Sequence, residues 1–178
     1  MIEQRALKQL QRETSLTKVP PSVEEMTLIH ELYLECIKYI HNSESKPPNF
    51  TWMGDTIQNS LTLCMPHDRN IHNFIFGGFL IRLAFELAYG NAVMFARSDV
   101  RFLSLDDIVF RKPVPIGSFL ALSSQIVYSI DSQFQVSVRA DVVNPYENTR
   151  DTTNTFYFTF SISPILAPRV MPRSYDER

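Results

Sequence analysis

One long apolar run constrains the fold of this chain more than any other feature. Residues 79–96, FLIRLAFELAYGNAVMFA, follow a pair of glycines and keep apolar side chains on most sides of a helix. A helix of that kind has to be buried on most sides. Strand-like segments follow it, so we expect a helix from about residue 78 to residue 96 wrapped by an antiparallel sheet, in an α+β fold.

The strands are expected on both sides of this helix in the sequence. Four segments after it are rich in β-branched and aromatic residues, and residues 133–143 alternate with a period of two. The expected ranges are 98–113, 118–130, 133–143 and 153–163, and one strand is expected before the helix at 55–65. Asp131 and Ser132 are expected to form a short hairpin turn, and residues 144–151 a longer one.

The N-terminal part of the chain is predicted to be helical. The first helix is expected at residues 2–16, where apolar side chains share one face, and Pro20 and Pro21 end it. Ser22 lies three residues before Glu25, which is the pattern of a capping box. A second amphipathic helix of about 20 residues follows from there. The predicted organisation is therefore helices and linker at 1–50, one domain at 51–164 and an irregular tail at 165–178.

Composition excludes several classes of function. The 178 residues suggest a single domain, and the net charge of -2 without a basic stripe argues against nucleic-acid binding. Cys36 and Cys64 form neither a disulfide framework nor a zinc signature. We also expect no apolar run of the roughly 18 residues that a membrane helix needs. The first 15 residues are fairly basic but contain Glu3 and Glu13, so no targeting signal is predicted there.

The two glycines before the apolar run have two interpretations. Glycine is a poor residue with which to begin a helix, so Gly77 and Gly78 need another explanation. Without side chains, the free N–H groups of a helix N-terminus are open to the oxygen atom of a ligand. The alternative is that glycine only allows the helix to pack tightly on the sheet.

The surrounding residues resemble a known family. The pattern Asn70-x-x-Asn73-x-x-Phe76-Gly77-Gly78, the helix after it and the later strands are similar to the hot-dog fold and, within it, to the acyl-CoA thioesterases. The segments LDDIVFRKPVPIGSFLALSSQIVY and TTNTFYFTF look like strands of that family. The resemblance runs from about residue 20 to residue 161. It is closest to the second repeat of the two-repeat mitochondrial thioesterases of the acyl-CoA thioesterase 9 type, and therefore implies a mitochondrial location.

That resemblance implies roles for individual residues. The backbone N–H groups of Gly77 and Gly78 would form an oxyanion hole, and Asn73, with Asn70 as the other candidate, would orient water or the thioester. Asn70 would tie down the loop beside the substrate, and Phe76 belongs to the same motif. In the family an Asp lies nine residues after the motif aromatic, but this position is Phe85 here.

The following residue, Glu86, is therefore the candidate carboxylate. It lies roughly 12 Å along the helix from Gly78, at about 1.5 Å per residue, so it would serve the oxyanion hole of a partner protomer rather than its own. The alternative is structural, because Arg82 lies four residues earlier and is placed to pair with it. Catalysis by Glu86 would require at least a homodimer.

Other candidate sites are weaker. His67, Asp68 and His72 lack a third histidine and an established spacing, so we predict a polar turn and no metal or other cofactor. Arg111 and Lys112 have the charge to contact the phosphates of coenzyme A, although a solvated strand end is the simpler explanation. Ser123 and Ser124 lack the setting of a serine hydrolase nucleophile. No histidine follows the long helix, which excludes a hydratase of this fold.

Two functions remain. The first is hydrolysis of fatty acyl-CoA thioesters to the free acid and coenzyme A. The second is a non-catalytic half that binds acyl-CoA or completes a site on another hot-dog chain. The loop that precedes Gly77 favours the enzyme, whereas Phe85 favours the non-catalytic half.

Overall fold

The chain divides into two compact units, residues 1–46 and residues 47–177. The computed structural model describes residues 22–41, 49–106, 108, 112–163, 166–174 and 177. The helix expected at 2–16 lies outside these residues. The two units are described separately below.

The first unit contains the helix α2, Val23–His41. The predicted capping box is confirmed, because the Glu25 N–H donates to Ser22 Oγ at 3.2 Å and the Ser22 N–H donates to Glu25 Oε2 at 2.7 Å. Glu24 and Glu25 place negative charge in the first turn, where it stabilises the helix dipole.

The second unit is built from one long helix and seven strands among the described residues. In chain order it contains β1 (Phe50–Trp52), η2 (Met53–Thr56), β2 (Gln58–Leu63), η3 (Pro66–Asp68), α3 (Gly77–Ala96), β3 (Arg101–Leu105), β4 (Phe119–Ile130), β5 (Gln133–Asn144), β6 (Thr149–Ser161) and β7 (Arg169–Met171). The expected long helix and the strands before and after it are present. The strand expected at 98–113 is shorter, and the one expected at 153–163 begins earlier.

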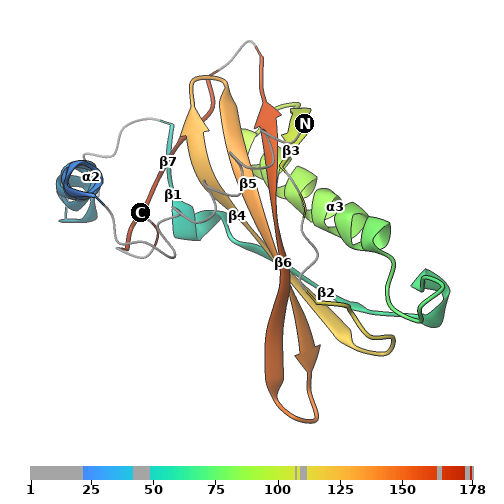
Figure 1. The fold of residues 1–178 in the computed structure, drawn as a ribbon. Coiled ribbons are helices and arrows are strands. Elements are labelled where there is room, and N and C mark those ends of the chain that lie inside the picture. The colour runs from blue at the N-terminus through green and yellow to red at the C-terminus, as the bar shows by residue number, and fades with distance from the viewer. Residues whose placement is uncertain are drawn as a thin grey trace, which may run out of the picture. The chain divides into compact units, whose positions relative to one another are not determined.

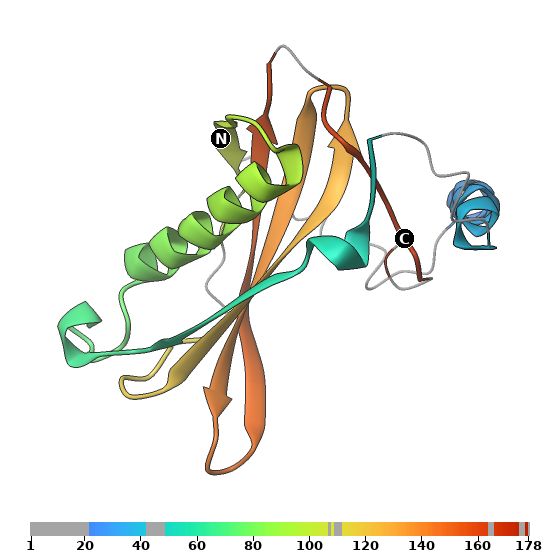
Figure 2. The same ribbon diagram turned by 180° about the vertical axis from the view of Figure 1, so that it is seen from behind.

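Five of the strands form one antiparallel sheet in the order β2-β4-β5-β6-β3. The predicted tight turn joins β4 to β5, with Asp131 at a φ of 50°. The helix α3 lies along one face of this sheet, and the long strands β4, β5 and β6 curve around it (Figures 1 and 2). Sequence order and spatial order differ, since β3 follows α3 directly but pairs with β6 at the far edge.

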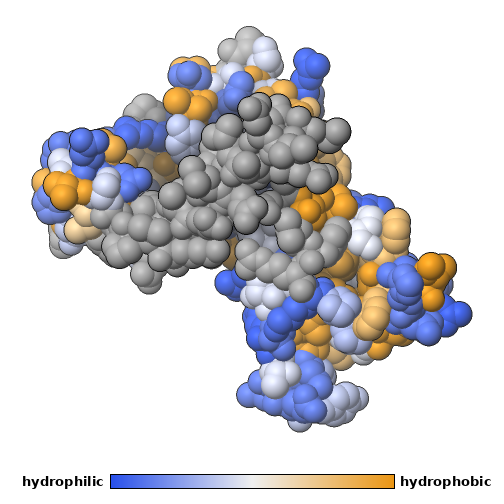
Figure 3. Space-filling view, viewed as in Figure 1, coloured by the Kyte–Doolittle hydropathy of each residue, from blue (hydrophilic) through white to orange (hydrophobic). Residues whose placement is uncertain are grey.

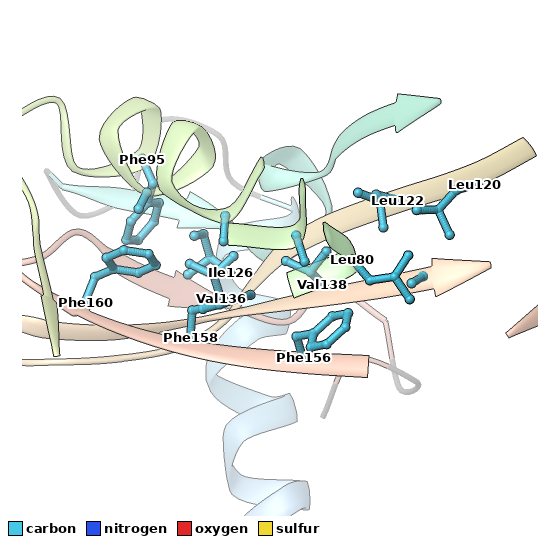
Figure 4. Packing of buried hydrophobic residues seen from close by; sticks show 14 of the residues in the cluster. Leu80, Phe95, Leu120, Leu122, Ile126, Val136, Val138, Phe156, Phe158 and Phe160 are labelled. Atoms are coloured by element: carbon cyan, nitrogen blue, oxygen red, sulfur yellow. The ribbon is translucent and has the colours of Figure 1, made fainter. Parts of the chain in front are cut away.

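The core lies between α3 and the sheet. The helix contributes one buried stripe, Leu80, Ala84, Ala88, Ala92 and Phe95. Alternate residues of the strands meet it, including Val136, Val138, Phe156, Phe158 and Phe160 (Figure 4). The three alanines let the helix axis approach the sheet, while the phenylalanines fill the space beside them.

One polar side chain is buried on the same side of the helix. Asn91 Nδ2 donates to the Thr56 carbonyl oxygen and to Ser124 Oγ, both at 2.9 Å. The Ile126 N–H donates to Thr56 Oγ1 at 3.0 Å. These bonds tie α3 to η2 and β4. They also satisfy the side-chain amide of Asn91, which would be costly to bury without hydrogen-bond partners.

Two expectations from the sequence are corrected here. The tail was expected to be irregular, but Arg169–Met171 forms β7, which pairs in parallel with β1. We also expected no run long enough for a membrane helix. Among the described helices, α3 is long and apolar enough by length and composition. Core helices pass the same test, and the buried stripe of α3 packs against the sheet.

Candidate active site

The start of α3 is open. Its N-cap residue, Phe76, makes no side-chain cap, and the first turn contains no acidic residue. The N–H groups of Phe79 and Leu80 donate to the Phe76 carbonyl oxygen, at 3.0 and 3.3 Å. Those of Gly77 and Gly78 have no hydrogen-bond partner within the described part of the chain. Two adjacent donors at the positive end of a helix are therefore available to an oxygen atom.

Gly78 also makes room for a neighbouring ring. A Cβ atom on Gly78 would lie 2.4 Å from Cε1 of Phe76, whose side chain is 59% exposed. Cβ atoms in proteins do not lie so close to another heavy atom, so the Phe76 ring would have to move. The structure thus gives Gly78 a packing role against Phe76, which neither interpretation of the sequence included.

Hydrogen bonds within the loop before α3 hold it in place. The Phe76 N–H donates to the Asp68 carbonyl oxygen at 2.9 Å, and Arg69 forms a bridge with Ile75. The Asn70 N–H donates to the Phe74 carbonyl oxygen at 2.7 Å. The loop is therefore a closed hairpin whose base is fixed to the N-cap residue of the helix.

The two asparagines of this loop have different surroundings. Asn70 Oδ1 accepts from the N–H groups of His72 and Phe74, at 2.8 and 3.2 Å, as expected for a residue that ties down the loop. Its Nδ2 has no partner among the described residues. Asn73 is in the left-handed conformation with a φ of 62°, and its Oδ1 accepts from Arg69 Nη1 at 3.4 Å. Of the two asparagines, Asn70 but not Asn73 lines one of the two cavities described next.

Two cavities meet at Phe76 and Gly78. The larger has a volume of about 670 Å³ and is mostly apolar, with polar groups from Asn70, His72 and Lys112; its other lining residues are Phe74, Ile75, Phe76, Gly77, Gly78, Leu80, Pro113 and Val114. The smaller, of about 370 Å³, is lined by His67, Asp68, Arg69, Phe76, Gly78, Phe79 and Arg82. In Figure 3, apolar and hydrophilic side chains lie side by side at the end of the domain that carries η3 and the start of α3. The free N–H groups therefore have an apolar cavity and a charged one beside them.

Of the two basic residues predicted to bind phosphate, the structure describes one. Lys112 lies at the larger cavity and its Nζ pairs with Asp151 Oδ1 at 2.8 Å. Both side chains are exposed, so this pair contributes little and leaves the ammonium group accessible. Arg111 lies outside the described residues.

Glu86 is found in the structural arrangement that the sequence offered as an alternative. Its Oε1 lies 3.5 Å from Arg82 Nη1, and its side chain is 57% exposed. Arg82 also lies over the ring of Phe79, 5.4 Å from its centroid. The cation is therefore satisfied by neighbours on its own helix, as expected for residues four positions apart.

Phe85 belongs to an aromatic cluster at the edge of the sheet. Its ring centroid lies 5.3 Å from that of Phe102 on β3, 5.8 Å from Phe158 and 6.0 Å from Tyr89. Phe102 remains 41% exposed. The position where the family carries an Asp is thus filled by apolar packing, which excludes a general base at this residue.

Cys64 lies near the loop but is no candidate nucleophile. Burial raises the pKa of its thiol, the negative charge of Asp68 raises it further, and a hydrogen bond with Ser118 partly opposes these effects. The thiol therefore stays protonated and unreactive near neutral pH. Among the described residues, no group of three or more His, Cys, Asp or Glu side chains is arranged to hold a metal ion.

The sequence interpretation missed the position of His67 and Asp68. They were considered only as metal ligands or as a polar turn. In the structure they form part of η3 and line the smaller cavity together with Gly78. Their nearness to the glycines in the sequence was the available signal. The turn that brings them back to Phe76 could not be predicted, because it depends on contacts between residues that are not neighbours in the chain.

Comparison with known structures identifies the fold as the hot-dog fold. No model of a known protein family matches the chain. An acyl-CoA hydrolase from Staphylococcus aureus, whose structure contains butyryl-coenzyme A, superposes with a TM-score of 0.68 and 26% identity. The match covers 72% of this chain and 81% of that one. A hexameric acyl-CoA thioesterase, 24% identical, superposes with a TM-score of 0.68 and supports the fold alone.

The sequence is more similar to longer proteins. It is 44% identical over 167 residues to the mitochondrial acyl-coenzyme A thioesterase 9 of Mus musculus and of Homo sapiens. The match covers 92% of this chain but 38% of each relative. The predicted resemblance to the acyl-CoA thioesterases is confirmed, and the chain spans about two fifths of the length of these curated relatives.

Variants of the Staphylococcus aureus hydrolase allow one comparison of spacing. Structures exist with alanine in place of an asparagine, of an aspartate 15 residues after it, and of a threonine 17 residues after the aspartate. Counted from Asn70, the same spacing leads here to Phe85 and Phe102. Counted from Asn73, it leads first to Ala88, which is fully buried against the sheet. Neither count reaches an aspartate, so the spacing alone does not choose between Asn70 and Asn73.

Proposed function

We propose that this chain hydrolyses acyl-CoA thioesters to the free acid and coenzyme A. The observation that carries the proposal is the pair of Gly77 and Gly78 N–H groups, which have no hydrogen-bond partner among the described residues and lie at the wall of an apolar cavity. A thioester carbonyl becomes an oxyanion when water attacks it, and donors fixed in advance stabilise that charge most strongly. The similarity to acyl-CoA thioesterases supports the same reaction.

The cavities suggest how the substrate lies. The acyl chain occupies the larger cavity, where Ile75, Leu80 and Val114 offer apolar walls. The carbonyl oxygen accepts from the Gly77 and Gly78 N–H groups. Asn70 is the asparagine of the site in place of Asn73, because its Oδ1 is held by the loop and its Nδ2 is left to donate. Lys112, at the same cavity, contacts an anionic group of the substrate after releasing Asp151.

We further propose that the chain acts as an oligomer in mitochondria. The hexameric thioesterases of the same fold support assembly, and the mitochondrial relatives support the location. The unpaired outer edge of β3 and the exposed part of Phe102 beside it are consistent with a neighbour at that edge.

One observation favours a second function. Phe85 and Phe102 stand at the spacing where the Staphylococcus aureus hydrolase has an aspartate and a threonine, and their rings pack together. A chain without those polar groups is suited to bind acyl-CoA and complete the site of another hot-dog chain without reacting. Both functions place acyl-CoA in the same cavity, but only the first includes hydrolysis of the thioester.

The test is thiol release from acyl-CoAs of increasing chain length, measured with the purified chain while its oligomeric state is determined in the same buffer. We expect turnover by an oligomer. Binding of acyl-CoA without thiol release, by a folded oligomer, would establish the non-catalytic function instead. Asn70→Ala is expected to lower kcat by about 10²-fold, the loss typical of an orienting or oxyanion-binding donor, whereas Asn73→Ala is expected to change it little.

A further inference from the structure

We propose that His67, oriented by Asp68, is the general base of this reaction; the proposal rests on the proposed thioesterase function. The residues considered so far do not supply a general base. Phe85 cannot accept a proton, and Glu86 is engaged by Arg82 on the exposed side of α3. Attack of water on a thioester at neutral pH needs a nearby base, so another group beside Gly77 and Gly78 has to supply it.

His67 and Asp68 meet the geometric requirement. His67 Nε2 lies 3.3 Å from Asp68 Oδ2, and both residues line the smaller cavity with Gly78. The imidazole is 74% exposed and open to water, whereas the carboxylate is 14% exposed and held inside the turn. A solvent-accessible imidazole beside a partly buried carboxylate is the arrangement of a histidine base with an orienting acid.

The backbone fixes this pair relative to the oxyanion hole. The Asp68 N–H donates to the Met65 carbonyl oxygen at 3.1 Å, and the Asp68 carbonyl oxygen accepts from the Phe76 N–H at 2.9 Å. Phe76 is the residue directly before Gly77. The turn η3 therefore cannot move away from the start of α3 without breaking a hydrogen bond, and the base stays beside the carbonyl site.

The pairing selects the reactive nitrogen. The Nε2 atom lies beside the Asp68 carboxylate, so Nδ1 is the ring nitrogen left for water. The other charged groups at this cavity are Arg69 from the loop and Arg82 from α3, and Arg82 pairs in turn with Glu86. His72, by contrast, lines the other cavity and has no carboxylate partner among the described residues.

The chemical step then balances without another reactant. Nδ1 of His67 takes a proton from water as the water oxygen bonds to the thioester carbon, and the carbonyl oxygen becomes an oxyanion held by Gly77 and Gly78. When the intermediate collapses, the carbon–sulfur bond breaks and the imidazolium returns its proton to the leaving thiolate. The products are one carboxylic acid and one thiol.

The experiment compares His67→Gln, Asp68→Asn and the matched control His30→Gln, which changes a histidine on α2 in the other unit. We expect His67→Gln to lower kcat by about 10²-fold or more and Asp68→Asn by a smaller factor, with KM little changed, since a general base contributes about 10²–10⁴-fold. His30→Gln should keep the kcat of the unchanged chain. Thermal unfolding of each variant checks the fold.

Two further readouts separate a base from a structural residue. The kcat of the unchanged chain should fall at acidic pH, because a protonated base cannot accept a proton from water, and His67→Gln should lose that dependence. Added imidazole should partly restore kcat to His67→Ala. A structural role would produce neither result.

The outcomes are distinct. If the unchanged chain releases no thiol, the proposed function fails and this inference fails with it. If the chain is active and folded His67→Gln retains kcat within about threefold, this inference alone is wrong. Loss of kcat in Glu86→Gln but not in His67→Gln would also overturn it, and would assign the base to the carboxylate of a partner copy.

Discussion

The two described helices of this chain begin in opposite ways. α2 starts with a complete capping box, in which Ser22 and Glu25 satisfy each other's backbone N–H groups, and acidic side chains fill its first turn. α3 starts after a phenylalanine, without a side-chain cap and without an acidic residue in its first turn. In α2 these N–H groups are used for stability, whereas in α3 two of them have no partner within the part of the chain that the structure describes.

The difference shows where each helix obtains its stability. α2 has many exposed residues along its length, so its own caps and propensities matter. α3 buries a full stripe of side chains against the sheet, and this packing stabilises it without a cap. A missing cap typically costs about 1 kcal/mol, which a buried helix can tolerate. The open end of α3 is therefore available for a substrate.

The largest expected effect comes from closing the open end with a side chain. Gly78→Val should lower kcat/KM by about 10²-fold or more, because the new Cβ displaces the Phe76 ring and the branched side chain covers the N–H groups. Thiol release and thermal unfolding measure the two effects.

The matched control for this variant is Gly90→Ala on the same helix, where an added Cβ meets nothing within 4 Å. It should raise stability by about 0.5–1 kcal/mol, since glycine inside a helix is unfavourable, and should leave kcat/KM within a few-fold. Full activity in a folded Gly78→Val chain would contradict our placement of the oxyanion hole.

A smaller effect is expected from giving α3 the kind of cap that α2 already has. Phe76→Asp should stabilise the chain by about 1 kcal/mol, because a carboxylate at the N-cap accepts from the free N–H group of Gly78. The same bond should lower turnover by occupying this donor. Chemical denaturation and thiol release report the two quantities, with Phe76→Ala as the control that removes the ring without adding a cap. A more stable variant with undiminished turnover would separate this N–H group from catalysis.

The smallest effect is expected at α2. Ser22→Ala should cost this helix about 1 kcal/mol and leave turnover unchanged. The Ser22 N–H, and then its hydroxyl, hold the pKa of Glu25 below its ordinary value of 4.5. Because the pKa of Glu25 is lowered in the folded state, the stabilisation that comes from its ionised carboxylate is present above pH 4.5. It is lost as the pH falls through the pKa of Glu25 in the folded chain.

Amide exchange of α2 between pH 6 and pH 3 measures that loss. An NMR titration of Glu25 in Ser22→Ala should show its pKa rising only part of the way toward 4.5, because the backbone N–H of residue 22, the larger contribution, remains. Hydrogen exchange at the start of α3, which has no acidic residue in its first turn, should lack this acid-dependent change. An unaltered Glu25 titration in Ser22→Ala would show that the Ser22 hydroxyl does not lower the pKa of Glu25.

Much of the fold follows from local patterns in the sequence. The period of two in 133–143, the apolar run at 79–96 and the Ser22–Glu25 pair each depend on residues that are neighbours in the chain. The strand β7 was missed because Arg169–Met171 is held by pairing with β1, more than a hundred residues away. A three-residue strand with a distant partner leaves no periodic signal of its own.

The candidate site was only partly predictable for the same reason. Gly77 and Gly78 were found because a glycine pair before a helix is a local feature. The choice between Asn70 and Asn73 depends on which side chain the loop turns toward the cavity, and the spacing of the motif leaves both possible. The placement of His67 and Asp68 depends on a hydrogen bond from Phe76 that closes the loop.

The sequence by itself determined the helices, most of the strands, the layer in which α3 packs and the open helix end, because these follow from propensity and from the burial of apolar faces. The tertiary structure decided which polar groups surround that open end. It placed Asn70 at the apolar cavity and His67 with Asp68 at the charged one, and it filled the position of Phe85 with aromatic packing. Those contacts join residues from different elements, and their geometry exists only after the sheet has closed around the helix.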